Sequence, residues 1–145
     1  MAAPTYTWEF VCDLMGDRVP KVVTLEAAAS LETKVGTLCI MSSGQVAACA
    51  GTDVLIVGLA AEATAAALSA ADPIKVALLF PGAVIKGTAD ADASSLAGFA
   101  GKLVDMNTNG SLDVADSTNG SLAVWRTENS GLTVYCVVTK GALYA

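Results

Sequence analysis

The chain has 145 residues, enough for one domain with a hydrophobic core and without disulfide bonds. Hydrophobic residues make up 54% of it and charged residues only 15%, so we expect apolar surface that becomes buried in an assembly; a monomer with an alanine-rich exterior is the alternative. The net charge of −6 and the scattered Lys and Arg residues exclude nucleic acid as the expected partner, because phosphate binding needs clustered positive charge.

The first predicted strand, residues 5–11, alternates Tyr6, Trp8 and Phe10 with other residues, which places three aromatic side chains on one face. Large aromatic residues often anchor protein contacts, so these three are candidate residues for contact with another subunit or with a partner protein. Residues 1–17 then form a candidate N-terminal contact arm. The alternative is an ordinary edge strand that packs its aromatic side chains inward.

A second strand is predicted over residues 18–25, at a sheet edge because Pro20 cannot donate a backbone hydrogen bond. A β-hairpin follows at residues 36–50, where the sequence GTLCIMSSGQVAACA places a short polar turn between two apolar stretches. We expect Gly44 to take a positive φ in this turn and to tolerate β-branched residues poorly.

Residues 54–60 form the most apolar predicted strand, which we expect to be covered on both faces. The alanine-rich residues 60–71 predict a short helix that ends before Pro73. Glu62 and the weak hydrophobicity of alanine argue against a membrane span in this region, so no membrane partner is expected. Further strands are predicted over residues 74–80 and 83–89, followed by a loop.

Residues 101–115, with the sequence GKLVDMNTNGSLDVA, repeat the first hairpin in altered form. The matching positions are Gly36/Gly101, Leu38/Leu103, Met41/Met106 and Gly44/Gly110. A shorter repeat, TNGSL, occurs at residues 108–112 and again at 118–122. Each Asn-Gly pair predicts a type I′ turn, with Gly110 and Gly120 as turn glycines. Strands at 121–127, 132–138 and 142–145 then complete a single all-β domain over residues 1–145, a small sandwich or barrel of hairpins with one short helix.

The sequence offers little for catalysis or for binding a cofactor. It contains no histidine, and Asp113 with Asp116, or Glu9 with Asp13, are the remaining candidate carboxylate pairs. These two pairs are explained equally well as solvated carboxylates in turns. We therefore do not expect the chain to be an enzyme. Asp90 and Asp92 resemble half of a calcium loop whose glycine and glutamate are missing, and no phosphate-binding glycine motif occurs, so no metal or cofactor is expected.

The four cysteines have no metal-binding spacing. Three of them, Cys12, Cys39 and Cys136, lie in apolar stretches, which predicts buried free thiols; a disulfide across the first hairpin is the alternative. The N-terminus lacks the features of a signal peptide, so we expect synthesis in a reducing cytoplasm. The cysteines are Cys12, Cys39, Cys49 and Cys136.

The order of these elements resembles the small capsid decoration proteins, or head-stabilising auxiliary proteins, of tailed bacteriophages. The resemblance lies in the Gly-x-Leu hairpins, the stretch VLIVGLAAEATAAA and the stretch IKVALLFPG, and it covers residues 34–145. It implies a β-tulip-like or related fold and a structural role without catalysis. It also implies homotrimers on the outer surface of the virion, which bind the major capsid protein and stabilise the shell.

Two other functions fit the sequence. One is a different virion part, such as a minor capsid or head–tail joining protein. The other is a ligand- or glycan-binding β-sandwich, which would expose Trp8 or Trp125 in a groove.

Overall fold

The computed structural model describes residues 3–49, 55–118 and 120–142. This part of the chain is built from antiparallel strands, with two 3₁₀ turns and no α-helix. The all-β class predicted from the sequence is therefore confirmed. The elements are β1 (Glu9–Asp13), β2 (Val22–Glu26), β3 (Leu38–Ser42), β4 (Gln45–Ala48), β5 (Ile56–Ala60), β6 (Pro73–Leu78), β7 (Ala83–Thr88), η1 (Ser94–Leu96), β8 (Asp105–Met106), β9 (Leu112–Asp113), β10 (Leu122–Glu128), η2 (Asn129–Gly131) and β11 (Thr133–Val138).

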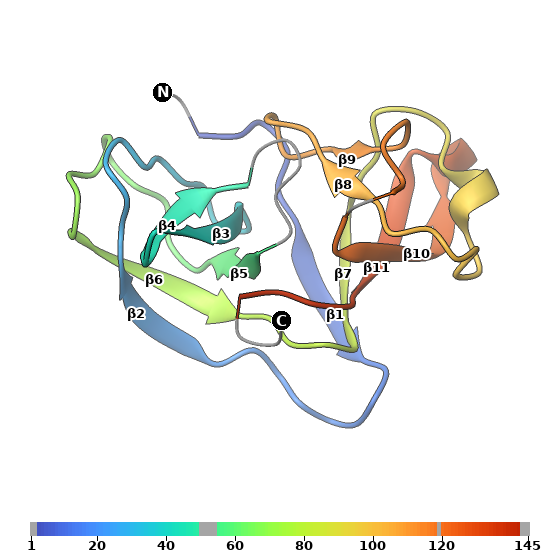
Figure 1. Ribbon diagram of the computed structural model, residues 1–145, viewed down its shortest axis with the longest axis horizontal. Helices are drawn as coiled ribbons and strands as arrows, with labels where there is room; N and C mark the ends of the chain where they lie inside the picture. Colours follow the sequence, from blue (N-terminus) through green and yellow to red (C-terminus); the bar gives the residue numbers. More distant parts are fainter. Residues whose placement is uncertain (1–2, 50–54, 119, 143–145) are drawn as a thin grey trace.

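The strands form two groups, which lie side by side in Figure 1. The first group is a sheet of order β2-β6-β5-β3-β4, and a parallel bridge between Ala27 and Val46 joins its two ends. The second group is a sheet of order β1-β7-β11-β10 together with the β8–β9 hairpin. Bridges from Ala89 to Leu112 and from Val104 to Leu122 connect that hairpin to β7 and β10. Each group is therefore a small closed barrel, called here the first and the second barrel.

The two barrels repeat one topology, with β2 to β6 matching β7 to β11 in the same order. The strand registers agree as well: Val23 lies opposite Val76 in the first barrel, as Ile85 lies opposite Cys136 in the second. The closing hydrogen bonds also correspond, from Ala28 N–H to the Val46 carbonyl (2.8 Å) and from Asp90 N–H to the Leu112 carbonyl (3.0 Å). The hairpin repeat seen in the sequence is thus part of a repeat that spans five strands.

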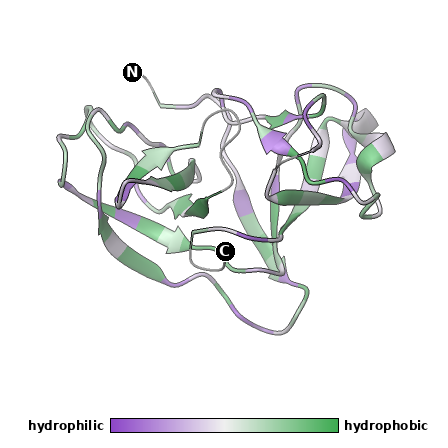
Figure 2. Cartoon of the chain, viewed as in Figure 1, coloured by the Kyte–Doolittle hydropathy of each residue, from purple (hydrophilic) through white to green (hydrophobic). Residues whose placement is uncertain are grey.

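Two clusters of buried side chains hold the barrels together. The smaller cluster fills the interior of the first barrel and includes Cys39, Val46, Val57 and Val76. The larger cluster fills the second barrel and extends to the outer face of β3 and β5, so the barrels share a core. All five residues of β5 are buried, which confirms the prediction of a strand covered on both faces, and Figure 2 shows its mostly hydrophobic colour.

The predicted helix over residues 60–71 does not form. Instead, this segment runs beside residues 27–33, with hydrogen bonds from Thr64 N–H to the Thr33 carbonyl (3.0 Å) and from Leu68 N–H to the Leu31 carbonyl (2.9 Å). A short alanine-rich helix gains little stability by itself, whereas the extended path lets Leu68 pack against the interior of the first barrel. Tertiary packing therefore overrides the helical preference of alanine.

The three predicted turn glycines differ in their surroundings. Ser43 and Gly44 both have positive φ, 50° and 79°, as a type I′ turn requires. Around Gly110 the type I′ prediction is wrong: Gly110 N–H donates to the Asn107 carbonyl (3.0 Å), Asn107 N–H donates to the Ser111 carbonyl (2.8 Å), and only Gly110 has a positive φ. This is the three-residue loop that ends in a glycine bulge.

The second Asn-Gly turn is described only in part, because Asn119 lies outside the described residues. Gly120 lies so close to the Val104 carbonyl oxygen that a Cβ atom would collide with it. Most of the predicted final strand, residues 143–145, also lies outside the described residues.

Candidate contact surface and pockets

Trp8 is a core residue of the folded chain. Its side chain is only 3% exposed, and the indole ring lies against Gly87 of β7, where a Cβ atom would collide with the ring. The indole N–H donates a 2.7 Å hydrogen bond to the Gly110 carbonyl. Trp8 is therefore not available as a surface anchor, and the inward-packed edge strand describes it correctly.

The backbone around Trp8 connects the two barrels. Trp8 N–H donates to the Gly36 carbonyl (2.8 Å) at the start of the first hairpin, and Tyr6 N–H donates to the Asn109 carbonyl (2.9 Å) in the second. Both hairpins identified from the sequence repeat thus hold the same N-terminal segment. Residues 6–8 are part of the fold and do not form a free arm.

The other two candidate aromatic residues lie in different environments. Phe10 is half-buried, and its ring centroid lies 6.1 Å from that of Phe80. Tyr6 is 38% exposed and is the one residue of the three that another protein would reach directly. The strand predicted over residues 5–11 therefore overlaps β1 only at residues 9–11, and its three aromatic side chains do not form a single contact surface.

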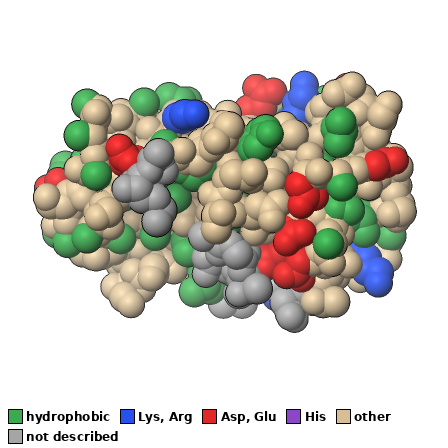
Figure 3. Space-filling view, turned by 90° about the horizontal axis from the view of Figure 1, so that it is seen from above, with side chains coloured by type: hydrophobic (Ala, Val, Ile, Leu, Met, Phe, Trp, Pro, Cys, Tyr) green, Lys and Arg blue, Asp and Glu red, His purple; other side chains and the backbone are tan. Residues whose placement is uncertain are grey.

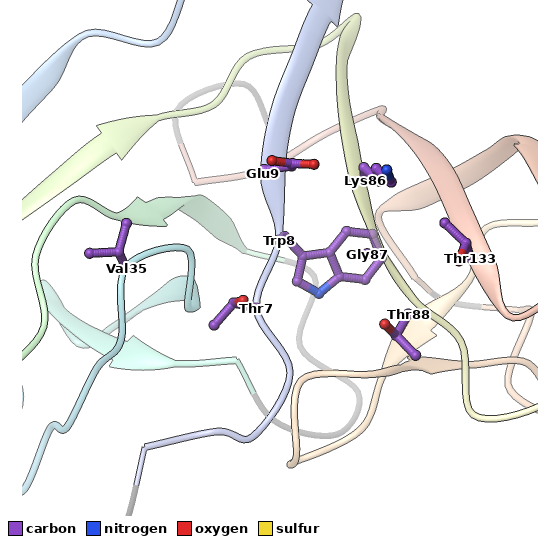
Figure 4. A pocket seen from close by; sticks show the side chains of 8 residues that line it. All are labelled: Thr7, Trp8, Glu9, Val35, Lys86, Gly87, Thr88 and Thr133. Carbon is purple, nitrogen blue, oxygen red and sulfur yellow. The ribbon is translucent and has the colours of Figure 1, made fainter.

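A polar hollow of about 430 Å³ lies beside Trp8, as Figure 4 shows. Its lining combines one acidic side chain, one basic side chain and threonine hydroxyl groups with a few other residues. The lining residues are Thr7, Trp8, Glu9, Val35, Lys86, Gly87, Thr88 and Thr133. Glycan binding would need an exposed aromatic face on which a sugar could stack. Trp8 does not offer one because it is buried, and Trp125 is half-buried at a bulge in β10.

Exposed large hydrophobic residues are concentrated in the stretch of chain where β1 leads into β2. Of the ten large hydrophobic residues that are exposed in the described part of the chain, five fall between residues 11 and 22. They are Val11, Leu14, Met15, Val19 and Val22. We call this set the apolar segment; because such clusters favour association, it replaces the aromatic residues as the candidate contact surface.

A salt bridge and a ring contact give the apolar segment a defined shape. Arg18 Nε lies 3.0 Å from Asp13 Oδ2, its guanidinium group also donates to the Pro81 carbonyl (2.9 Å), and its Cζ lies 4.2 Å from the centre of the Phe80 ring. The hydrogen bond from Arg18, followed by those from backbone amides, lowers the pKa of Asp13 below its ordinary value. Asp13 is thereby kept charged and acts as a fixed acceptor for this loop.

A second hollow, of about 450 Å³, borders the apolar segment. Met15 and Arg18 line one side of it, and the lining continues over Pro81, Gly82 and residues 137–139. Most of these groups are apolar, so the hollow is suited to a hydrophobic side chain of another protein. Met15 belongs both to the apolar segment and to the lining of the hollow, so the two meet at this residue.

The charged residues show no basic patch on the face seen in Figure 3, where Lys and Arg side chains are few and separate and acidic side chains are more numerous. Across the second sheet, Glu9, Lys86, Tyr135 and Arg126 lie opposite one another in register. The Arg126 Cζ atom lies 3.8 Å from the centre of the Tyr135 ring. These groups partner one another along the row, which fits a stabilised sheet surface.

The described residues contain no group of three or more Cys, Asp or Glu residues placed to hold a metal ion. Among the candidate carboxylates, Asp13 is paired with Arg18, and Asp116 N–H donates to the Asp113 carbonyl (3.1 Å) within a turn. Within the same part of the chain, no helix has the length and hydrophobicity that crossing a membrane requires.

All four cysteines are free thiols, and the predicted burial is confirmed for Cys39 and Cys136. It is wrong for Cys12, which is half-buried near the end of the edge strand β1, whereas Cys49 is buried although it was not among the three. Burial raises the pKa of the Cys39 thiol to about 12 and raises the pKa of Cys136 as well, because a thiolate is poorly solvated in the core.

We expect iodoacetamide at pH 8 to label half-buried Cys12 first, and to label Cys39 and Cys136 only after urea unfolds the chain. Peptide mass spectrometry measures this order, and rapid labelling of Cys136 in the folded protein would contradict it.

Comparison of the sequence with known protein-family models and with curated proteins finds no match.

Proposed function

We propose that this chain is a structural virion protein that binds the outer surface of a bacteriophage capsid and stabilises it. The proposal rests on the resemblance of residues 34–145 to capsid decoration proteins, and the apolar segment is the structural observation that supports it best. The apolar segment presents exposed hydrophobic side chains on an ordered loop, and the apolar hollow lies beside it. These are features of a surface that becomes buried against another protein.

The major capsid protein is the proposed partner, and homotrimers at three-fold positions of the shell are the proposed arrangement. A closed symmetric assembly of this kind presents the same surface three times, so a weak contact of each copy becomes a strong attachment of the trimer. The contact is non-enzymatic and needs no cofactor. The proposed location is the exterior of the virion, after synthesis in the host cytoplasm.

The test is attachment to shells of the virus that encodes the chain, prepared without this protein. We expect Met15→Asp to weaken cosedimentation with the shells about tenfold, because a charge replaces a 76% exposed apolar side chain in the proposed contact. The matched control is Val35→Asp, which changes a 66% exposed valine outside the apolar segment and should bind normally. Equal binding of both variants would rule out this surface.

Counting copies per virion by quantitative mass spectrometry separates decoration from the other virion roles. A protein that covers the shell should be present in on the order of hundreds of copies, whereas a joining ring contains about a dozen or fewer. A protein absent from purified particles would overturn the proposed function altogether.

A further inference from the structure

The two Asn-Gly pairs of the chain lie in identical local sequences. Residues 108–112 and residues 118–122 both read TNGSL, with Asn109 and Asn119 as the asparagines. An Asn-Gly pair is especially prone to spontaneous deamidation, because glycine has no side chain to block the attack of its backbone nitrogen on the asparagine side chain. Since the neighbouring residues are the same, the folded structure decides any difference in rate between the two pairs.

Deamidation at Asn109 proceeds through a five-membered succinimide ring. The Gly110 nitrogen loses its proton and attacks Asn109 Cγ, the bond from Cγ to the side-chain nitrogen breaks, and ammonia leaves. Water then opens the ring at either of its two carbonyls. One product is an ordinary aspartate at position 109. The other is an isoaspartate, in which the main chain runs through the former side-chain carbonyl.

Both reacting groups of this pair are held by hydrogen bonds within the turn. Gly110 N–H donates to the Asn107 carbonyl (3.0 Å), so the attacking nitrogen keeps its proton engaged. Asn109 Oδ1 accepts bonds from the Ser111 N–H (3.0 Å) and from the Ser111 hydroxyl (2.7 Å), which fixes the side-chain amide. Asn109 itself is exposed, so water reaches the site freely. The hydrogen bonds, and not exclusion of water, therefore limit the reaction.

Residues 6–8 hold the same peptide groups from outside the turn. Tyr6 N–H donates to the Asn109 carbonyl (2.9 Å), and the Trp8 indole N–H donates to the Gly110 carbonyl (2.7 Å). Gly110 also lies so close to the Tyr6 carbonyl oxygen that a Cβ atom would collide with it. Ring closure turns the peptide group between Asn109 and Gly110 out of its place in the turn. The docked residues 6–8 oppose this rotation.

We propose that Asn109 is a deamidation site that is closed while residues 6–8 are docked, and that isoaspartate at this position releases these residues. Only molecules that have opened locally react, so the rate follows the fraction in which residues 6–8 are undocked. Isoaspartate adds a methylene to the main chain and converts the carbonyl that accepts the Tyr6 N–H into a carboxylate outside it. The Gly110 carbonyl is displaced from the Trp8 indole at the same time. A transient opening thereby becomes permanent.

Peptide mass spectrometry of protein kept at pH 8 follows both asparagines in one sample. In guanidinium chloride, Asn109 and Asn119 should deamidate at the same rate because their neighbouring residues are identical. In the folded protein, Asn109 should react at least about tenfold more slowly than in guanidinium chloride. Equal rates for Asn109 in the folded and unfolded chain would overturn the proposal.

Trp8→Phe tests whether docking closes the site. The variant keeps a ring but loses the bond to the Gly110 carbonyl, so Asn109 should react about threefold faster in the folded protein. Asn119 should keep its rate, and it shows in the same sample whether the whole fold has loosened. Trp125→Phe, the same change at the other tryptophan, should alter neither rate. An unchanged rate at Asn109, or an equal acceleration at both asparagines in Trp8→Phe, would contradict the proposal.

The isoaspartate form tests the release of residues 6–8. It is made in guanidinium chloride from the double variant Asn119→Gln with Trp125→Phe, in which Asn109 is the only Asn-Gly asparagine and Trp8 the only tryptophan. After refolding, acrylamide should quench its fluorescence about twofold more strongly than that of the unreacted double variant.

Asn109→Asp in the same background is the matched control. It gains the same negative charge without the extra methylene, and it should be quenched like the unreacted double variant. Quenching of the isoaspartate form that does not exceed this control would overturn the release of residues 6–8. Loss of the whole fold by circular dichroism would also overturn it, because the proposed release is local. Neither experiment uses capsids, so these outcomes are independent of the proposed function.

Discussion

Replacing Trp8 by alanine should lower the free energy of unfolding by about 3–5 kcal/mol, the usual cost of removing a large buried aromatic side chain. The indole fills the space over Gly87 and donates to the Gly110 carbonyl, so the variant loses both packing and a buried hydrogen bond. Urea denaturation followed by circular dichroism measures the change. Trp8→Phe, which keeps a ring but removes the N–H group, should lose less.

Tyr6→Ala is the matched control because Tyr6 is an exposed aromatic residue two positions away in the same segment. Its effect on stability should stay within about 0.5 kcal/mol. If Trp8→Ala left stability equally unchanged, the burial of the indole between the barrels would be incorrect. The contact-arm interpretation of Trp8, in which the mutation weakens capsid attachment more than folding, would then return.

Gly110→Ala should be much more destabilising than Gly44→Ala, although both glycines occupy hairpin turns. Gly110 has a φ of 90°, and an added Cβ atom would collide with the Tyr6 carbonyl oxygen, so we expect a loss of about 3 kcal/mol or more. Gly44 has a φ of 79°, but its Cβ position has no neighbour within 4 Å, and backbone strain alone should cost about 1–2 kcal/mol.

Thermal unfolding of the two alanine variants in parallel measures this difference. A smaller loss for Gly110→Ala than for Gly44→Ala would show that residues 6–8 can move away from the second hairpin at little cost. The hydrogen bonds from Tyr6 and Trp8 to the two hairpins would then contribute less than their geometry indicates.

The strands were largely predictable from the sequence because alternating and apolar stretches are bounded by glycine, proline and asparagine. The first hairpin and β5 lie where these patterns place them. The full repeat of five strands was not predictable, since β2 and β7, or β6 and β11, share a register but few residue identities. Only the hairpins retain matching Gly, Leu and Met residues that a sequence comparison of the two halves can detect.

The errors arose where local preference and tertiary packing disagree. Alanine favours a helix over residues 60–71, but pairing with residues 27–33 covers the first barrel and decides the conformation. For Trp8, alternation shows that the aromatic side chains share a face but does not show whether that face is inside or outside. The signal for its burial lies in Gly87, far along the chain, where the absence of a side chain makes room for the ring.

The pairing of β1 with β7 has a consequence for the order of folding. During synthesis, all five strands of the first barrel precede β7, so β1 must wait until residue 88 has emerged from the ribosome before it can pair. Until then, Trp8 and Phe10 have no core in which to pack. The N-terminal strand should therefore dock late, and the nascent chain should pass through a state in which one barrel is complete while its first strand is still exposed to solvent and to chaperones.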